Sequence, residues 1–203
     1  MRLLSHRSQL THIVGRENVK NAVIDMCDPF KNFIREFFPN AAITADKFHV
    51  LRLLNPALLR KRKEITGTRA DADAKRLLLM SSKKLDPSKR FTLHRFLEKY
   101  PELFELYVWK ERLHGFYRMR GHKRAVRALT AMTDAMALSN LPEIKTLRRT
   151  IMKWRSEILN YFLSRITNGR TEGFNNKAKV VKRRAYGYRS FRNYRLKVLT
   201  ACV

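Results

Sequence analysis

The stretch VKNAVIDMCDPFKNFIREFFPNAAITAD, residues 19–46, decides the fold of the first part of the chain. Short apolar runs at 19–24 and 41–45 flank a segment that begins with Asp28-Pro29, a typical helix start, and carries phenylalanines on one face. A strand, a helix and a second strand within so few residues are close to the size of a parallel crossover unit. The stretch therefore predicts two parallel strands joined by a helix.

An aspartate follows each predicted strand, Asp25 after the first and Asp46 after the second. Parallel strands end at the same edge of a sheet, where open α/β sheets bind ligands, so both carboxylates are expected at that edge. Neighbouring strands lie roughly 4.8 Å apart, which is close enough for the two side chains to share a site. Either aspartate alone could instead be a helix cap or a turn residue, but their matched positions favour a shared site.

Residues 50–166 show helical periodicity almost throughout, without an evident internal repeat. The clearest pattern follows Pro142, where apolar residues recur at steps of three and four in what we predict to be one helix: Ile144, Leu147, Ile151, Trp154, Ile158 and Tyr161. A stripe of this kind is typical of core packing rather than of a cofactor site. The predicted fold class is therefore α/β but mostly helical.

Residues 167–197, TNGRTEGFNNKAKVVKRRAYGYRSFRNYRLK, carry ten Lys or Arg and a single acid, Glu172. A helix here would turn one apolar stripe to a core: Phe174, Ala178, Val181 and Ala185. It would turn a second, polar stripe to a ligand: Glu172, Asn176, Lys179 and Arg183. Around Gly187 aromatic residues alternate with arginines, a pattern that suits nucleic-acid backbones and exposed bases. The alternative is a solvated basic helix whose tyrosines belong to the core.

The charge balance points to a polyanionic partner. The chain of 203 residues has 44 basic and 17 acidic side chains, a net charge of +27. Such an excess repels itself in a compact fold, so nucleic acid is the first candidate partner and an anionic membrane surface the second. No apolar run is long enough to span a membrane, and the apolar stretch in the start MRLLSHRS is too short for a signal peptide. Cys27 and Cys202 lie too far apart in the sequence to suggest a metal-binding pair.

Two segments resemble bacterial insertion-sequence transposases of the Asp-Asp-Glu type, in the group called the IS-L-three family. They are VIDMCDPFKNFIREFFPNAAITADKFHVLRLLN (residues 23–55) and ITNGRTEGFNNKAKVVKRRAYGYRSFRNYRLKVL (residues 166–199). The resemblance implies a ribonuclease H-like core, incomplete here, that is interrupted by a large all-helical insertion. It divides the chain into a partial core at 1–49, the insertion at 50–166, and a C-terminal core helix with a basic DNA-binding segment at 167–203.

The resemblance also implies roles for individual residues. By position, Asp25 matches the second catalytic aspartate and Glu172 the catalytic glutamate, and both would hold the divalent cation, Mg²⁺ or Mn²⁺. Asp46 and His49 match a signature of Asp or Cys, two residues, then His, which we expect to shape the site; a purely structural His49 is the alternative. The DNA-binding residues implied on and beyond the basic helix are Asn176, Lys179, Lys182, Arg183, Arg184, Arg189 and Arg192.

One departure from the family pattern bears on activity. The family's first catalytic aspartate lies well upstream of the second, yet residues 1–24 contain no aspartate, and Glu17 is their one acid. We therefore expect the C-terminal part of a longer transposase, with weak metal binding and without efficient strand transfer by the chain alone.

Three functions compete. The first is a DNA transposase that cleaves and transfers strands at insertion-sequence ends in the bacterial cytoplasm, associated with the nucleoid, as a homo-oligomer or with full-length transposase. The second is a non-catalytic DNA-binding fragment that competes with full-length transposase. The third is a generic RNA-binding protein, which neither the paired aspartates nor the two motif segments support.

Overall fold

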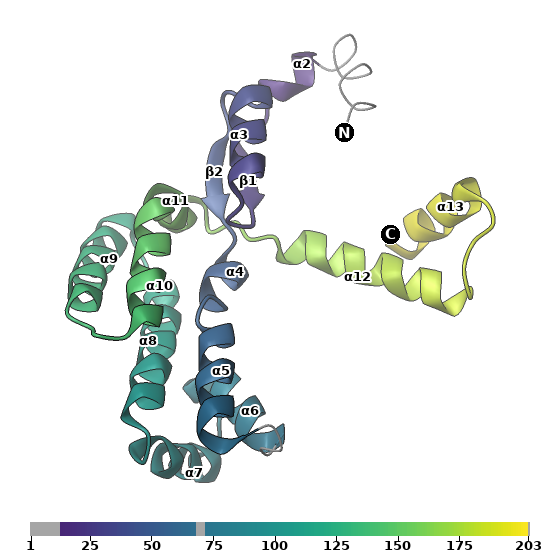
Figure 1. Cartoon of the computed structure of the whole chain (residues 1–203). Helices are drawn as coiled ribbons and strands as arrows, with labels where there is room; N and C mark the ends of the chain where they lie inside the picture. Colours follow the sequence, from purple (N-terminus) through teal and green to yellow (C-terminus); the bar gives the residue numbers. More distant parts are fainter. Residues whose placement is uncertain (1–12, 68–71, 203) are drawn as a thin grey trace. The chain divides into compact units, whose positions relative to one another are not determined.

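The computed structural model describes residues 13–67 and 72–202. The chain divides into two compact units, Met1–Arg165 and Ile166–Val203, which are described in turn (Figure 1). Among the helices that the structure describes, none combines the length and the apolar character needed to cross a bilayer.

The first unit contains a small parallel sheet. Strand β1 (Asn21–Ile24) and strand β2 (Ala42–Ala45) are joined by helix α3 (Asp28–Phe37), which confirms the predicted crossover. The register pairs Ile24 with Ala45, so the two strands end at the same level. Whatever follows these two residues therefore emerges at the same edge of the sheet.

Helix α11 (Arg155–Ser164) packs against strand β2 of the sheet. The phenylalanines of α3, in contrast, lie largely outside the core. The Asn160 side chain on α11 donates a hydrogen bond to the backbone oxygen of Ile43 at 2.7 Å, which fixes β2 against the helix. By contrast, Phe30 and Phe33 on α3 are 57% and 47% exposed. The apolar pattern thus located α3 correctly but did not show which of its residues are covered.

Helices fill the rest of the first unit, as the periodicity of residues 50–166 predicted. Several begin at or one residue before a proline, which fits the first helical turn because that position needs no backbone donor. In chain order the helical elements after β2 are α4 (Lys47–Leu51), α5 (Asn55–Thr66), α6 (Ala72–Leu79), the 3₁₀ turn η1 (Ser82–Lys84), α7 (Pro87–Glu98), α8 (Pro101–Arg118), α9 (His122–Ala137), α10 (Pro142–Lys153) and α11.

The core joins α8 to α11 through a cluster of aromatic rings. Phe116 and Tyr117 on α8 contact Tyr161 and Phe162 on α11, with ring centroids 4.8 to 5.9 Å apart. All four side chains are buried. Because α11 also packs on β2, this cluster ties the long helix α8 to the edge of the sheet.

The single helix predicted after Pro142 is wrong, because the structure divides it into α10 and α11. Trp154 separates the two with backbone angles of φ −104° and ψ 19°, outside the helical range. The amide of Trp154 still bonds to Thr150, and its carbonyl accepts from Ile158, so the interruption inserts no residue into the pattern. A break of this kind leaves the three-and-four spacing intact, and periodicity alone cannot reveal it.

The second unit is a pair of helices, α12 (Gly169–Arg184) and α13 (Phe191–Cys202), that pack against each other. Within its own unit α12 has no buried residue, so the expectation that one of its stripes faces a core stays a prediction. Phe174 is 38% exposed and Ala185 is exposed. Two short helices offer too little surface to enclose a stripe, so α13 covers α12 only in part.

Candidate functional site

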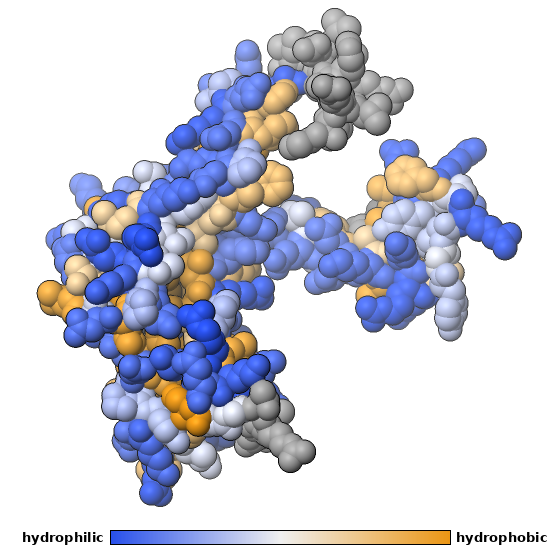
Figure 2. Space-filling view, viewed as in Figure 1, coloured by the Kyte–Doolittle hydropathy of each residue, from blue (hydrophilic) through white to orange (hydrophobic). Residues whose placement is uncertain are grey.

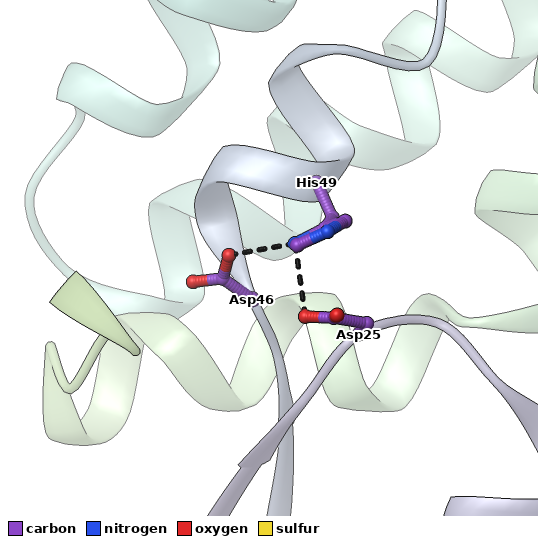
Figure 3. A group of neighbouring side chains, drawn as sticks. All are labelled: Asp25, Asp46 and His49. Atoms are coloured by element: carbon purple, nitrogen blue, oxygen red, sulfur yellow. Dashed lines mark hydrogen bonds and ion pairs between the residues drawn. The ribbon is translucent and has the colours of Figure 1, made fainter. Parts of the chain in front are cut away.

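Asp25, Asp46 and His49 gather at the carboxyl edge of the sheet (Figure 3). Asp25 directly follows β1, and Asp46 directly follows β2 and precedes α4. The amide of Asp46 donates to the carbonyl of Ile24 at 2.8 Å, which extends the strand pairing by one step and fixes both aspartates at the same level. His49 lies one turn into α4, so its ring returns to the two carboxylates.

One imidazole nitrogen faces both carboxylates. His49 Nδ1 lies 2.9 Å from Asp46 Oδ2 and 2.9 Å from Asp25 Oδ1. Only the contact with Asp46 has hydrogen-bond geometry, and a neutral ring carries at most one proton on this nitrogen. Asp25 Oδ1 is buried and accepts no hydrogen bond from any residue that the structure describes. The three ligand atoms lie within 4.8 Å of one another, so the cluster could hold a metal ion.

The two aspartates differ in what can reach them. The side chain of Asp46 is completely buried, whereas those of Asp25 and His49 are 48% and 39% exposed. A group from solution can therefore contact Asp25 and His49 directly. Asp46 can act on such a group only through its contact with His49. This difference follows from the sheet, because β2 packs against α11 and is more deeply buried than β1.

Tyr117 on α8, a member of the aromatic cluster, is also related to the site. It is 2% exposed, and its hydroxyl has no hydrogen-bond partner among the described residues. Burial raises the pKa of Tyr117, and the charges of Tyr161 and Asp46 act in the same direction. The hydroxyl therefore stays protonated beside the buried carboxylate. Sequence reasoning missed this relation, because a tyrosine that packs its ring in a core can present its hydroxyl elsewhere at the same time.

Glu172 lies in the first turn of α12, in the second unit, and is partly exposed. Asp25 belongs to the first unit. The predicted convergence of these two carboxylates on one metal therefore stays a prediction.

The predicted DNA-binding side chains lie on the second unit, on α12, on the turn beyond it and at the start of α13. All of them are exposed: Asn176, Lys179, Lys182, Arg183, Arg184, Arg189 and Arg192. No acidic residue follows Glu172 in the chain. The exposed cations can therefore face a polyanion without an acidic neighbour in their own unit beyond the first turn of α12.

Comparison with known proteins gives one family and two relatives. Residues 3–198 match the family of transposases of the IS-L-three, Asp-Asp-Glu type. The chain is 26% identical over 194 residues to the transposase for insertion sequence element IS1001 of Bordetella parapertussis, covering 91% of this chain and 48% of that protein. It is 43% identical over 60 residues to an ATP-dependent protease of Lactococcus lactis subsp. lactis, covering 29% of this chain and 19% of that one.

The chain thus spans about half the length of the IS1001 transposase and about a fifth of the protease. No solved structure gives a significant match. The family match covers nearly the whole chain, whereas the protease match covers less than a third of it.

Proposed function

The chain belongs to the IS-L-three family of Asp-Asp-Glu transposases, and from this premise we propose that it acts in DNA transposition by metal-dependent strand cleavage and transfer at insertion-sequence ends. The observation that carries the proposal is the cluster of Asp25, Asp46 and His49 at the carboxyl edge of a parallel sheet. The net charge of +27 supports DNA as the substrate. We take the crossover unit as part of a ribonuclease H-like core at 1–49, residues 50–166 as its insertion, and 167–203 as the returning core helix with the basic segment.

The residues of the cluster fit a divalent cation. A buried carboxylate oxygen without a donor is costly, and Asp25 Oδ1 is such an atom. A bound Mg²⁺ or Mn²⁺ would satisfy it, polarise the scissile phosphate and lower the pKa of an attacking water. We assign Asp25 and Glu172 as its ligands, since both are accessible carboxylates and hard cations prefer oxygen.

Asp46 and His49 position the site. The buried Asp46 cannot touch a substrate phosphate, but it accepts the hydrogen bond from His49 Nδ1 and so fixes the ring beside Asp25. His49 Nδ1 lies 2.9 Å from Asp25 Oδ1, so the ring also limits where this carboxylate can lie. The exposed lysines and arginines of α12 would bind the phosphates that flank the reacting one.

A plasmid-nicking assay with purified chain and Mn²⁺ or Mg²⁺ tests this function. We expect slow, metal-dependent conversion of supercoiled DNA to open circles without efficient strand transfer, and a loss of this nicking of about a hundredfold or more in Asp25→Asn and in Glu172→Gln. Glu36→Gln, which changes an exposed acid on α3, is the matched control and should keep wild-type nicking. Nicking that survives in both site variants would refute the assigned roles.

A non-catalytic DNA-binding role is the second candidate. It is supported by the basic second unit, whose exposed lysines and arginines can bind DNA phosphates without any contribution from the metal site. Asp25 and Glu172 by themselves would leave two cations about 4 Å apart with excess positive charge. In this role the chain would compete with a full-length transposase for element ends. Tight plasmid binding without nicking in the same assay would select it over catalysis.

A further inference from the structure

Helix α12 ends in a turn that places a tyrosine where glycine is the usual residue. The amide of Gly187 donates to the carbonyl of Lys182 at 3.3 Å, and that of Tyr186 to the carbonyl of Arg183 at 3.1 Å. This pair of bonds is the Schellman arrangement, whose left-handed position commonly carries glycine. Here that position is Tyr186, with φ +50°, and the glycine stands one residue later. A side chain with a Cβ is strained in this conformation.

The strain is not offset by packing. Tyr186 is fully exposed, and Phe191, at the start of α13, is 78% exposed. The two other aromatic residues of the turn are partly buried and contact each other: Tyr188 and Tyr194 have ring centroids 5.3 Å apart. The fold therefore has its own aromatic pair and does not need Tyr186 or Phe191. Strained residues that the fold does not need are typical of functional sites.

The surroundings of the turn are cationic and hollowed. The exposed side chains of Lys182, Arg183 and Arg184 precede Tyr186, and Arg189 follows it. A cavity of about 280 Å³ lies beside the turn, lined by Lys182, Tyr188, Ser190, Phe191 and Tyr194. On the face seen in Figure 2, apolar groups of α13 lie among hydrophilic ones. Aromatic side chains beside exposed cations suit a ligand that carries both bases and phosphates.

We propose that the α12–α13 turn is a stacking site for unpaired nucleotides of the DNA, on which Tyr186 and Phe191 hold bases while Lys182 and the neighbouring guanidiniums hold phosphates. The proposal rests on the proposed function, since it assumes that the second unit binds DNA. It adds the substrate class: in a duplex the base faces are already stacked, so protruding rings gain most from a strand whose bases are open. Duplex DNA would engage the same cations without the rings.

The test uses the full chain and fluorescence anisotropy with three probes of roughly 12 nucleotides, a length within the range of single-strand sites. They are oligothymidylate, the same backbone with internal abasic positions, and a mixed-sequence duplex. The variant Tyr186→Gly deletes the ring and keeps the left-handed turn, so the fold is retained. We expect it to weaken oligothymidylate binding roughly 5- to 100-fold, the range for loss of base stacking, and duplex binding by less than about twofold. Tyr186→Phe should bind like wild type.

Controls separate this proposal from the general one. Phe91→Ala removes an aromatic residue that is 65% exposed on α7 in the first unit and should change nothing. Wild-type chain should bind the abasic strand at least as weakly as Tyr186→Gly binds oligothymidylate, because Phe191 loses its base as well. Equal binding of the abasic and thymidine strands, or equal losses on single strand and duplex, would overturn the stacking site alone. Failure of the wild-type chain to bind any of the three probes would overturn the proposed function as well.

Discussion

At the scale of single residues, the most unusual group outside the site is Lys110, a cation with no exposed surface. Its ammonium donates to the carbonyls of Leu78 and Met80, both at 2.7 Å, and lies 3.0 Å from a carboxylate oxygen of Glu111. An ammonium has three protons, and here each has an acceptor, which offsets the loss of hydration. Burial still lowers the pKa of Lys110, and the charge of Glu111 opposes this. This side chain therefore ties the end of α6 to α8.

The carboxylate of Glu111, which pairs with Lys110, should make the stability of the fold depend on pH. Burial alone would raise the pKa of Glu111, but the charge of Lys110 and the hydrogen bonds from Ser82 outweigh it, so the pKa is lowered. The folded state then favours the carboxylate, and this contribution is present at neutral pH and lost as the pH falls through the lowered pKa. We expect Glu111→Gln to reduce the free energy of unfolding by roughly 1–3 kcal/mol at pH 7. The gap from wild type should shrink below about pH 4.

Urea unfolding followed by circular dichroism from pH 7 to pH 3 measures this gap. Glu98→Gln, at the exposed end of α7, is the control and should stay within about 0.5 kcal/mol of wild type throughout. A gap for Glu111→Gln that is independent of pH would show that the charge of Glu111 is not what stabilises the fold.

Also at this scale, the sequence could predict the aspartates but not the geometry that joins them. Asp25 and Asp46 follow strands of matched length, and the parallel crossover then dictates a shared edge. The double contact of His49 depends on the direction in which α4 leaves β2, which no residue type encodes. Lys110 was equally hidden, because nothing in the helical pattern around it distinguishes a buried ammonium from a solvated one.

At the scale of elements, two ion pairs attach α3 to the helical block, one mostly buried and one exposed. Lys31 Nζ lies 2.5 Å from Glu157 Oε1 on α11, and the two side chains are 14% and 6% exposed. The same lysine lies over the ring of Trp154, 4.8 Å from its centroid. A second pair between the same parts of the fold, Asp28 with Lys153, is about half exposed on both sides. The two pairs give a matched comparison.

We expect Glu157→Gln to destabilise the chain by roughly 1–3 kcal/mol, because Lys31 would keep its charge in a mostly buried position without a carboxylate. Asp28→Asn should cost less than about 1 kcal/mol, since exposed pairs contribute little. Thermal unfolding of both variants at pH 7 measures the difference. Equal losses would mean that burial does not decide the value of these pairs.

The second element prediction concerns the basic end of α12. Replacing Lys182, Arg183 and Arg184 together by alanine should weaken duplex binding with little effect on sequence preference, because phosphate contacts position DNA without specifying its bases. The slope of log affinity against log salt should fall by about 2 to 3, one counterion for each cation in contact. Anisotropy titrations at a series of salt concentrations measure both quantities. An unchanged affinity and slope would remove this helix from the binding surface.

The elements also show where periodicity fails. It located the crossover and most helices, because these depend on local spacing and on proline and aspartate at helix starts. It failed for the continuous helix after Pro142, and within the second unit it did not show that the apolar stripe of α12 is covered only in part. Burial of a stripe depends on what the rest of the chain supplies to cover it, and a break at Trp154 leaves the spacing unchanged. Neither the burial of a stripe nor a break in a helix can be read from the spacing of residues along the chain.

At the scale of the whole molecule, the positive charge is not confined to the basic segment. Residues 166–203 carry a net charge of +9, and residues 1–165 carry the remaining +18. Both units therefore attract a polyanion, and a long duplex should contact each of them. Binding of both units to one DNA molecule would also raise the effective concentration of Glu172 near Asp25.

Whether the two units complete one metal site can be measured without catalysis. If Asp25 and Glu172 hold the same cation, removing either ligand should weaken Mn²⁺ binding, and removing the second after the first should cost much less. A double-mutant cycle of Asp25→Asn and Glu172→Gln, by calorimetric titration of the full chain with Mn²⁺, should then give a coupling of at least about 1 kcal/mol, as for residues that interact directly. Asp46→Asn should also weaken binding, because it releases His49 from its position beside Asp25. Glu36→Gln is the control and should leave the titration unchanged. Additive losses for Asp25 and Glu172, or no loss in Glu172→Gln, would show that the cluster at the sheet edge binds Mn²⁺ without the second unit.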